Sequence, residues 1–210
     1  MLQVKMQHAQ EIDRISPGIF IWQAYDSKIK ADLFSTALET PAGTYVVDPI
    51  PLSPDGLSGL RNCGTAAGIF VTNRNHTRAA AEFASAFSVS TYANHSLRSS
   101  PDFPQSTWVQ DGEMFSEGLT AVTINGGPAG EMALHHNYNG GTVVIGDALI
   151  NFEPHGFGLL PAKYCPDANL MRRSLRKLLD YQFERMLFAH GTPIPSHARA
   201  RLEQLLKTIR

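Results

Sequence analysis

The chain of 210 residues is poor in charged side chains and has no long apolar run. Charged residues make up 18% and the net charge is −1, so the chain lacks the basic stripe that nucleic acids or an anionic membrane surface would attract. No stretch approaches the length of a membrane span, and Met1–Asp13 lacks the continuous apolar segment of a secretory signal. These absences predict a soluble, cytoplasmic protein that binds neither nucleic acid nor membrane.

Cysteine and the common catalytic motifs are also scarce. Cys63 and Cys165 lie far apart with no C-x-x-C pair, which favours a reducing compartment and leaves a single disulfide open. The sequence has no G-x-S-x-G, no P-loop and no G-x-G-x-x-G, which argues against a serine α/β-hydrolase and a nucleotide-binding fold. An apolar fraction of 43% is enough for a sizeable core, and we expect one domain over residues 1–210.

Hydrophobic periodicity predicts strands first and then alternating strands and helices. Three strands at Ile15–Trp22, Leu33–Thr40 and Thr44–Val47 follow one another closely and predict an antiparallel meander. Helical spacing predicts a helix over His76–Phe87 and another that Asp167 caps. Further strands are predicted at residues 68–72, 89–93, 120–124, 131–136, 142–145 and 186–189, with loop-rich segments at 94–111 and after Asp147. This order indicates layered sheets with helices outside.

Four short segments, in order, resemble the landmarks of the metallo-β-lactamase superfamily. Gly43–Asp48 resembles its early strand that ends in an aspartate, and Val71–His76 stands where it carries T-H-x-H-x-D-H. Gly126–Glu131 takes the place of its G-H-T-P-G-E, and Gly146-Asp147 and His190-Gly191 stand at its bridging aspartate and last histidine. The resemblance implies an α/β fold, the four-layer αββα sandwich of that superfamily.

The same resemblance implies a metal site with part of its ligands missing. Aligned without a gap, Asn73, Asn75, Thr77 and Arg78 replace the four ligands of the first motif. Aligned with two residues deleted, Asn75-His76 takes the place of Asp-His, and we prefer this alignment because a helix is then expected to start at His76. In either case the leading histidines are absent, and Gly127 replaces the histidine of the second motif.

His76, Asp147 and His190 therefore remain as candidate metal ligands, with Asn75 as a weak neutral oxygen donor. Two imidazoles and one carboxylate form a plausible site for one zinc, iron or manganese ion with water in the fourth place. Each residue also has an ordinary structural explanation, as a helix cap, a turn acceptor or a strand end, and the alternative of no metal stays open.

Two functions follow from this degenerate signature. The first is a metal-dependent hydrolase of an ester, thioester or lactone, with no identifiable general base because asparagine cannot accept a proton at neutral pH. The second is a non-catalytic protein that binds a small ligand or a partner in the former active-site groove, lined by Asn73, Arg74, Asn75 and Arg78 beside His190. Arg74 and Arg78 could bind an anion there, or pair with surface carboxylates.

Overall fold

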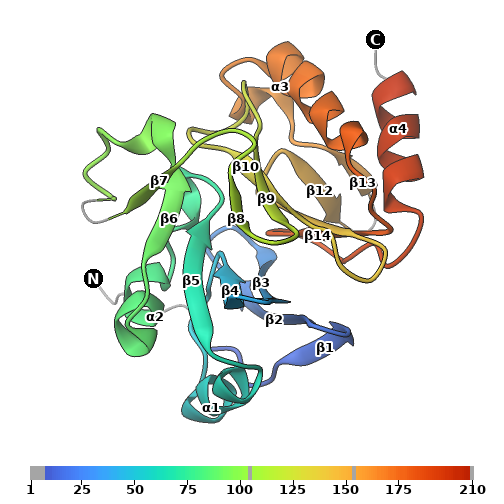
Figure 1. Cartoon of the computed structure of the whole chain (residues 1–210). Helices are drawn as coiled ribbons and strands as arrows, with labels where there is room; N and C mark the ends of the chain where they lie inside the picture. Colours follow the sequence, from blue (N-terminus) through green and yellow to red (C-terminus); the bar gives the residue numbers. More distant parts are fainter. Residues whose placement is uncertain (1–7, 104–105, 153–154, 209–210) are drawn as a thin grey trace.

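Two β-sheets form the centre of the molecule (Figure 1). The computed structural model describes residues 8–103, 106–152 and 155–208. The strands of the first sheet lie side by side in chain order, and they are β1 (Asp13–Ser16), β2 (Ile19–Asp26), β3 (Ala31–Thr40), β4 (Gly43–Val47), β5 (Ala66–Val71), β6 (Thr91–Asn94) and β7 (Thr107–Val109). The second sheet has the order β14-β11-β10-β9-β8, with β8 (Met114–Ser116), β9 (Leu119–Thr123), β10 (Met132–His136), β11 (Thr142–Ile145) and β14 (Arg185–Phe188).

The remaining elements are a hairpin, four α-helices and four short 3-10 turns within the described residues. Strands β12 (Leu149–Phe152) and β13 (Gly156–Leu159) pair with each other as a separate hairpin. The helices are α1 (Pro54–Asn62), α2 (Ala80–Phe87), α3 (Ala168–Leu175) and α4 (Ala198–Thr208), and the 3-10 turns are η1 (Arg74–His76), η2 (His95–Leu97), η3 (Ala162–Tyr164) and η4 (Arg176–Asp180). None of the helices in the described ranges is long and apolar enough to cross a membrane.

Three separate apolar clusters show that the molecule has four layers. One cluster packs the outer face of the first sheet against α1 and α2, and another packs the outer face of the second sheet against α3 and α4. The third lies between the sheets, where Phe70 of β5 meets residues such as Leu134 of β10 and Val144 of β11. The arrangement is the predicted αββα sandwich, and Figure 1 shows the two helix pairs on opposite sides of the sheets.

The side chains of these clusters alternate between the two faces of each central strand. In β5, Phe70 faces the second sheet while its neighbours Ile69 and Val71 face the helices. Successive side chains of a strand point to opposite faces, so a strand buried on both sides is apolar throughout. The same rule makes each central strand contribute to two cores at once.

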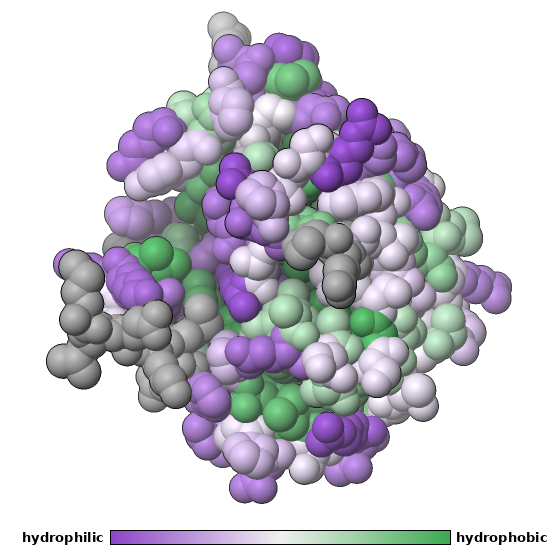
Figure 2. All heavy atoms as spheres, turned by 90° about the vertical axis from the view of Figure 1, so that its left-hand side faces the viewer, coloured by the Kyte–Doolittle hydropathy of each residue, from purple (hydrophilic) through white to green (hydrophobic). Residues whose placement is uncertain are grey.

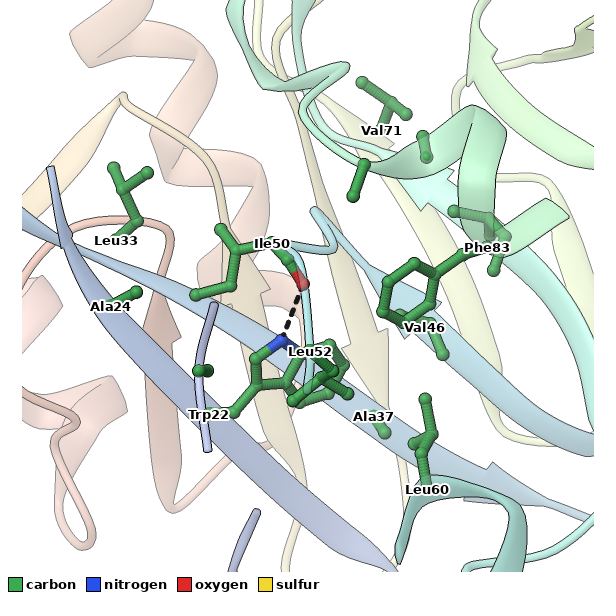
Figure 3. Packing of buried hydrophobic residues seen from close by; sticks show 14 of the residues in the cluster. Trp22, Ala24, Leu33, Ala37, Val46, Ile50, Leu52, Leu60, Val71 and Phe83 are labelled. Carbon is green, nitrogen blue, oxygen red and sulfur yellow. Dashed lines mark hydrogen bonds between the residues drawn. The ribbon is translucent and has the colours of Figure 1, made fainter. Parts of the chain in front are cut away.

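Trp22 organises the outer core of the first sheet (Figure 3). Its ring stacks on Phe83 of α2 with centroids 6.1 Å apart and planes 4° from parallel. Its buried indole N–H donates to the Ile50 carbonyl oxygen at 3.1 Å, which satisfies the one polar group that the ring carries into the core. Trp22 thereby connects β2, the segment after β4 and α2.

The face that carries α2 mixes hydrophilic and hydrophobic residues (Figure 2). Beside α2 lies an open cavity of about 640 Å³, lined by small residues such as Ala81 and Ser85 together with Phe103 and Asp102. Arg78 reaches the wall of this cavity, so the cavity adjoins the residues that follow His76.

The main sequence predictions for secondary structure are confirmed, with four exceptions. The meander β2-β3-β4 is antiparallel as predicted, the turn at Asn139–Gly141 joins the antiparallel pair β10 and β11, and Asp167 caps α3 by accepting from the Leu170 N–H at 2.8 Å. The predicted strand Ile15–Trp22 is wrong, because Pro17-Gly18 breaks it into β1 and β2 with Gly18 at φ +72°.

The predicted helix start at His76 is also wrong. His76 ends the 3-10 turn η1, and α2 begins only at Ala80, after Arg78 has taken a φ of +34°. The loop-rich segments predicted at 94–111 and after Asp147 contain η2 and β7 in the first case and the hairpin β12–β13 in the second. These strands are three or four residues long, too short to show a period in the sequence.

The two adjacent histidines of β10 face opposite sides of the sheet, as predicted. His136 points towards the first sheet, where its Nε2–H donates to the Glu39 carbonyl oxygen at 2.8 Å, while His135 donates to the Gln182 carbonyl oxygen at 2.9 Å. Nδ1 of His136 is buried without a hydrogen-bond partner among the described residues. Burial lowers the pKa of His136, so its imidazole is neutral in the folded protein.

We expect His136 to make stability depend on pH. Its folded pKa lies below the unfolded value of about 6.5, so below that pH the unfolded chain binds a proton that the folded chain excludes, and stability is lost as the pH falls. His136→Gln keeps an N–H donor but cannot titrate. Urea unfolding should show the free energy of unfolding falling less between pH 7 and pH 5 in this variant, by on the order of 1 kcal/mol.

His8→Gln, at an exposed position, is the matched control and should behave as the unchanged protein. Parallel pH profiles for His136→Gln and the unchanged protein would show that the prediction is wrong.

Candidate metal centre

Polar residues follow the carboxyl ends of four strands that reach one edge of the sandwich. Strands β4 and β5 run parallel in the first sheet, as do β11 and β14 in the second, so the residues after them meet at that edge. The residues concerned are Asp48 after β4, Thr72 to His76 after β5, Asp147 after β11 and His190 after β14.

Backbone hydrogen bonds join the two sheets at this edge. The Met132 N–H donates to the Thr72 carbonyl oxygen at 2.8 Å, and the Phe34 N–H donates to the Ala189 carbonyl oxygen at 3.0 Å. Gly146 allows a close approach of the two sheets, because a Cβ atom there would lie 2.6 Å from Thr72 Oγ1. The two sheets are therefore in direct contact where the polar residues gather.

His76, Asp147 and His190 lie together, as the gapped alignment requires. Nε2 of His76 is 3.1 Å and Nε2 of His190 is 3.2 Å from the same oxygen, Asp147 Oδ1, and the three candidate ligand atoms lie within 4.8 Å of one another. Two ligands about 2.0 Å from a tetrahedral ion are separated by about 3.3 Å. The three side chains therefore fit a single metal ion, and their role as ligands stays a prediction.

The Asp48 carboxylate and the Thr72 hydroxyl determine which nitrogen of His76 faces the centre. Thr72 Oγ1 donates to Asp48 Oδ2 at 2.5 Å, and His76 Nδ1 lies 2.9 Å from both of these oxygens. Because the carboxylate can only accept and the hydroxyl proton is already used, Nδ1 carries the proton. In the neutral imidazole Nε2 then carries the lone pair, and this nitrogen is buried without a hydrogen bond among the described residues.

Charges around His76 compensate one another. Burial alone would lower the pKa of His76, but the Asp48 and Asp147 carboxylates outweigh it and raise the pKa to about 9. Burial would raise the pKa of Asp48 and of Asp147, and in both cases the charge of His76 dominates and lowers it. Without a metal, His76 is thus an imidazolium between two carboxylates at neutral pH. A metal ion requires the neutral imidazole and displaces that proton.

The second oxygen of Asp147 contacts two asparagines. Asn73 Nδ2 donates to Asp147 Oδ2 at 3.1 Å and to Glu131 Oε2 at 2.7 Å, and Asn75 Nδ2 lies 3.5 Å from Asp147 Oδ2. Glu131 is buried, and its burial together with the charge of Asp147 raises its pKa to about 8. Asp147 therefore directs Oδ1 to the histidines and Oδ2 to the amides.

The four residues predicted to line a groove have different positions. Asn73 is fully buried, whereas Asn75 and Arg74 are exposed and Arg74 pairs with Asp102 at 2.9 Å, the ordinary surface explanation. Arg78 donates to the carbonyl oxygens of Phe34, Asp48 and Ala189, at 2.9, 3.1 and 3.5 Å. The guanidinium of Arg78 therefore joins β3 to the residues that directly follow β4 and β14. A role of these four residues in ligand binding stays a prediction.

Sequence reasoning misses the roles of Asp48, Thr72 and Glu131. It identifies Asp48 only as the end of a strand, although an aspartate directly before proline at a strand end is a position from which a side chain can reach the next strand. It places Thr72 in a strand and Glu131 at the start of another, and no local pattern relates either of them to His76 or Asp147. Their contacts depend on the packing of one sheet against the other.

Comparisons with known proteins agree with this fold. Residues 12–209 match the family model described as the metallo-β-lactamase superfamily. The DIM-1 metallo-β-lactamase structure is similar at 16% identity and a TM-score of 0.75, covering 98% of this chain and 100% of that one. A metallo-β-lactamase family protein from Thermus thermophilus follows at 17% identity and a TM-score of 0.66, with 93% of this chain and 80% of that one covered.

A third similar structure is a mutant flavo-di-iron protein from Thermotoga maritima, at 12% identity and a TM-score of 0.63, with 93% of this chain and 61% of that chain covered. A search of curated protein sequences found no match. At these identities the structures show the fold alone. The fold agrees with the family match, and because that match covers nearly the whole length of the chain, the chain belongs to the metallo-β-lactamase superfamily.

We expect the close approach at Gly146 to be essential for the centre. A Cβ there would lie 2.6 Å from Thr72 Oγ1 and 2.9 Å from Glu131 Oε1, so Gly146→Ala must displace these hydrogen-bonded side chains or the sheets that carry them. Overpacking of this kind costs about 1–3 kcal/mol of unfolding free energy, measurable by urea unfolding. Gly158→Ala is the matched control, because a Cβ there meets nothing within 4 Å. Equal stability of the two variants would contradict the expectation.

Proposed function

We propose that this protein is a metal-dependent hydrolase of the metallo-β-lactamase type that uses one divalent ion held by His76, Asp147 and His190. The observation that carries the proposal is the separation of the two imidazole nitrogens from Asp147 Oδ1, 3.1 and 3.2 Å, close to the spacing of ligands on one ion. The donor set of two imidazoles and one carboxylate suits zinc, iron or manganese.

The surroundings of the three side chains support this role. His76 is only 2% exposed, whereas the side chains of Asp147 and His190 are 12% and 14% exposed, so solvent and a small substrate can approach from the side of His190. Asp48 holds the proton on His76 Nδ1, an outer-sphere arrangement that orients a ligating imidazole. A bound ion would supply Lewis acidity and activate a water molecule.

We infer an ester, thioester or lactone as the substrate class, because hydrolysis of an acyl bond needs only an activated water and a polarised carbonyl. The chain's own residues would orient the ion, through His76, Asp147 and His190, and keep its inner side free of bulk water. Exposed Asn75 lies at the rim, where its amide can donate a hydrogen bond to a polar substrate group.

One observation favours a non-catalytic protein that binds a small ligand or a partner in this groove. The buried carboxylates Asp48 and Glu131 near the centre are both engaged: Asp48 accepts from Thr72 and His76, and Glu131 accepts from Asn73 and Ala148. Neither is free to remove a proton from water, and Asn75 cannot do so. Under this alternative the centre is a binding groove, with or without an ion.

Elemental analysis separates the two functions. Protein purified without a histidine tag should carry about one zinc, iron or manganese ion per chain under the hydrolase proposal. The double variant His76→Ala/His190→Ala should lose that ion, while His8→Ala, at an exposed position, should keep it. Protein that carries no ion and takes up none of the three metals on addition would rule out the hydrolase in this form.

Asp48→Asn tests the orientation of His76. The asparagine can present an N–H instead of an acceptor to Nδ1, which removes the preference for the tautomer with its lone pair on Nε2. We expect the affinity for Zn²⁺, measured by calorimetry, to fall about 10- to 100-fold, as is typical for the loss of an outer-sphere partner. An unchanged affinity would mean that Asp48 only stabilises the strand end.

A further inference from the structure

The fully buried amide of Asn73 has only one possible orientation. Its Oδ1 accepts the Asn75 backbone N–H at 2.9 Å, as the cap of the turn η1. The amide nitrogen must then point the other way, to Glu131 Oε2 at 2.7 Å and Asp147 Oδ2 at 3.1 Å. Both amide hydrogens are thus donated to carboxylates, and an exchange of the oxygen and nitrogen would break all three bonds.

This amide connects the sheets through their charged residues. Asn73 follows β5 of the first sheet, whereas Glu131 precedes β10 and Asp147 follows β11 in the second. Glu131 is held from its other side, where Oε1 accepts the Ala148 N–H at 2.9 Å. Asn73 therefore occupies the space between two buried carboxyl groups, so a cation could not bind between them without displacing the amide.

The neighbouring wall is closed as well. Gly127 stands where the related motif carries a histidine, and a Cβ there would lie 3.2 Å from Glu131 Cγ and 3.4 Å from Met171 Sδ. A side chain at position 127 would require Glu131 to shift by a few tenths of an ångström. The histidine of the related motif is therefore absent here, and Glu131 packs closely against the glycine that replaces it.

We propose that Asn73 is a positioning residue whose amide, bridging Glu131 and Asp147, takes the place of a second metal ion and restricts the centre to a single ion. This inference rests on the proposed function. The amide donates a hydrogen bond to Oδ2 of Asp147, while Oδ1 of the same carboxylate is directed to His76 and His190. The site is therefore built for one ion, rather than being a two-ion site that has lost a metal.

The test is to count Co²⁺ ions bound by the metal-free full-length protein and by Asn73→Asp. The substitution replaces two N–H donors by a carboxylate between Glu131 and Asp147, and three converging carboxylates form an oxygen site that a hard divalent ion fills. Equilibrium dialysis against excess Co²⁺, followed by elemental analysis, should give one ion for the unchanged protein and two for Asn73→Asp. The added ion should also show a new Co²⁺ absorption band in the visible spectrum.

Asn73→Ala measures the positioning of Asp147 separately. The variant should still bind one Co²⁺, with an affinity about 10- to 100-fold lower because Asp147 Oδ2 loses its buried donor. Asn75→Ala is the matched comparison, since Asn75 contacts the same oxygen at 3.5 Å from an exposed position, and its loss should be much smaller. Circular dichroism checks that each variant is folded, and where Asn73→Asp fails to fold, the Asn73→Ala comparison decides.

The outcomes separate this inference from the proposed function. No ion in the unchanged protein refutes the hydrolase and this inference together, because there is then no single-ion centre for Asn73 to restrict. Two ions in the unchanged protein, or equal ion counts in the unchanged protein and Asn73→Asp, overturn the inference while leaving a metal centre in place. Equal affinity of Asn73→Ala and Asn75→Ala overturns the positioning role.

Discussion

The arrangement of the centre depends on the two oxygens of the Asp147 carboxylate, which have different partners. Asp147 Oδ1 faces His76 and His190, and Oδ2 accepts from Asn73. This arrangement requires the strand ends of both sheets to meet closely, which the missing side chain at Gly146 permits. A sandwich whose sheets were held slightly further apart would have the same residues without a common centre.

Burial of several charges in this edge imposes a second constraint. Asp48, Glu131 and Asp147 are all buried, and buried carboxylates are stable only when they are paired, hydrogen-bonded or protonated. Asp48 and Asp147 share His76, while Glu131 accepts from Asn73 and Ala148. Arg78 adds a positive charge and donates to carbonyl oxygens of β3 and of the residues that follow β4 and β14. The charged groups at this edge are therefore held in place by contacts with one another and with the backbone.

The local sequence pattern was sufficient to predict secondary structure wherever the conformation of a segment depends on its own residues. The short apolar run at residues 68–72 and the Asn139–Gly141 turn predicted strands correctly, and the αββα class was implied by the resemblance of four ordered segments to the superfamily. Local pattern failed at His76, where the Asn73 cap and the unusual φ of Arg78 delay α2 to Ala80. Both Asn73 and Arg78 make hydrogen bonds to residues that flank strands of the second sheet. Helix propensity depends only on neighbouring residues, so it could not predict where α2 begins.

The layered fold and the three candidate ligands can be predicted from the amino-acid order, because strand periodicity and the spacing of landmarks are carried by neighbouring residues. That Asp48 and Thr72 orient His76, and that Asn73 bridges Glu131 and Asp147, becomes visible only in the folded molecule. The cause is distance along the chain. Asp48 and Thr72 are 24 residues apart and Asn73 and Asp147 are 74 apart, and only the packing of strands and sheets brings them within hydrogen-bonding reach.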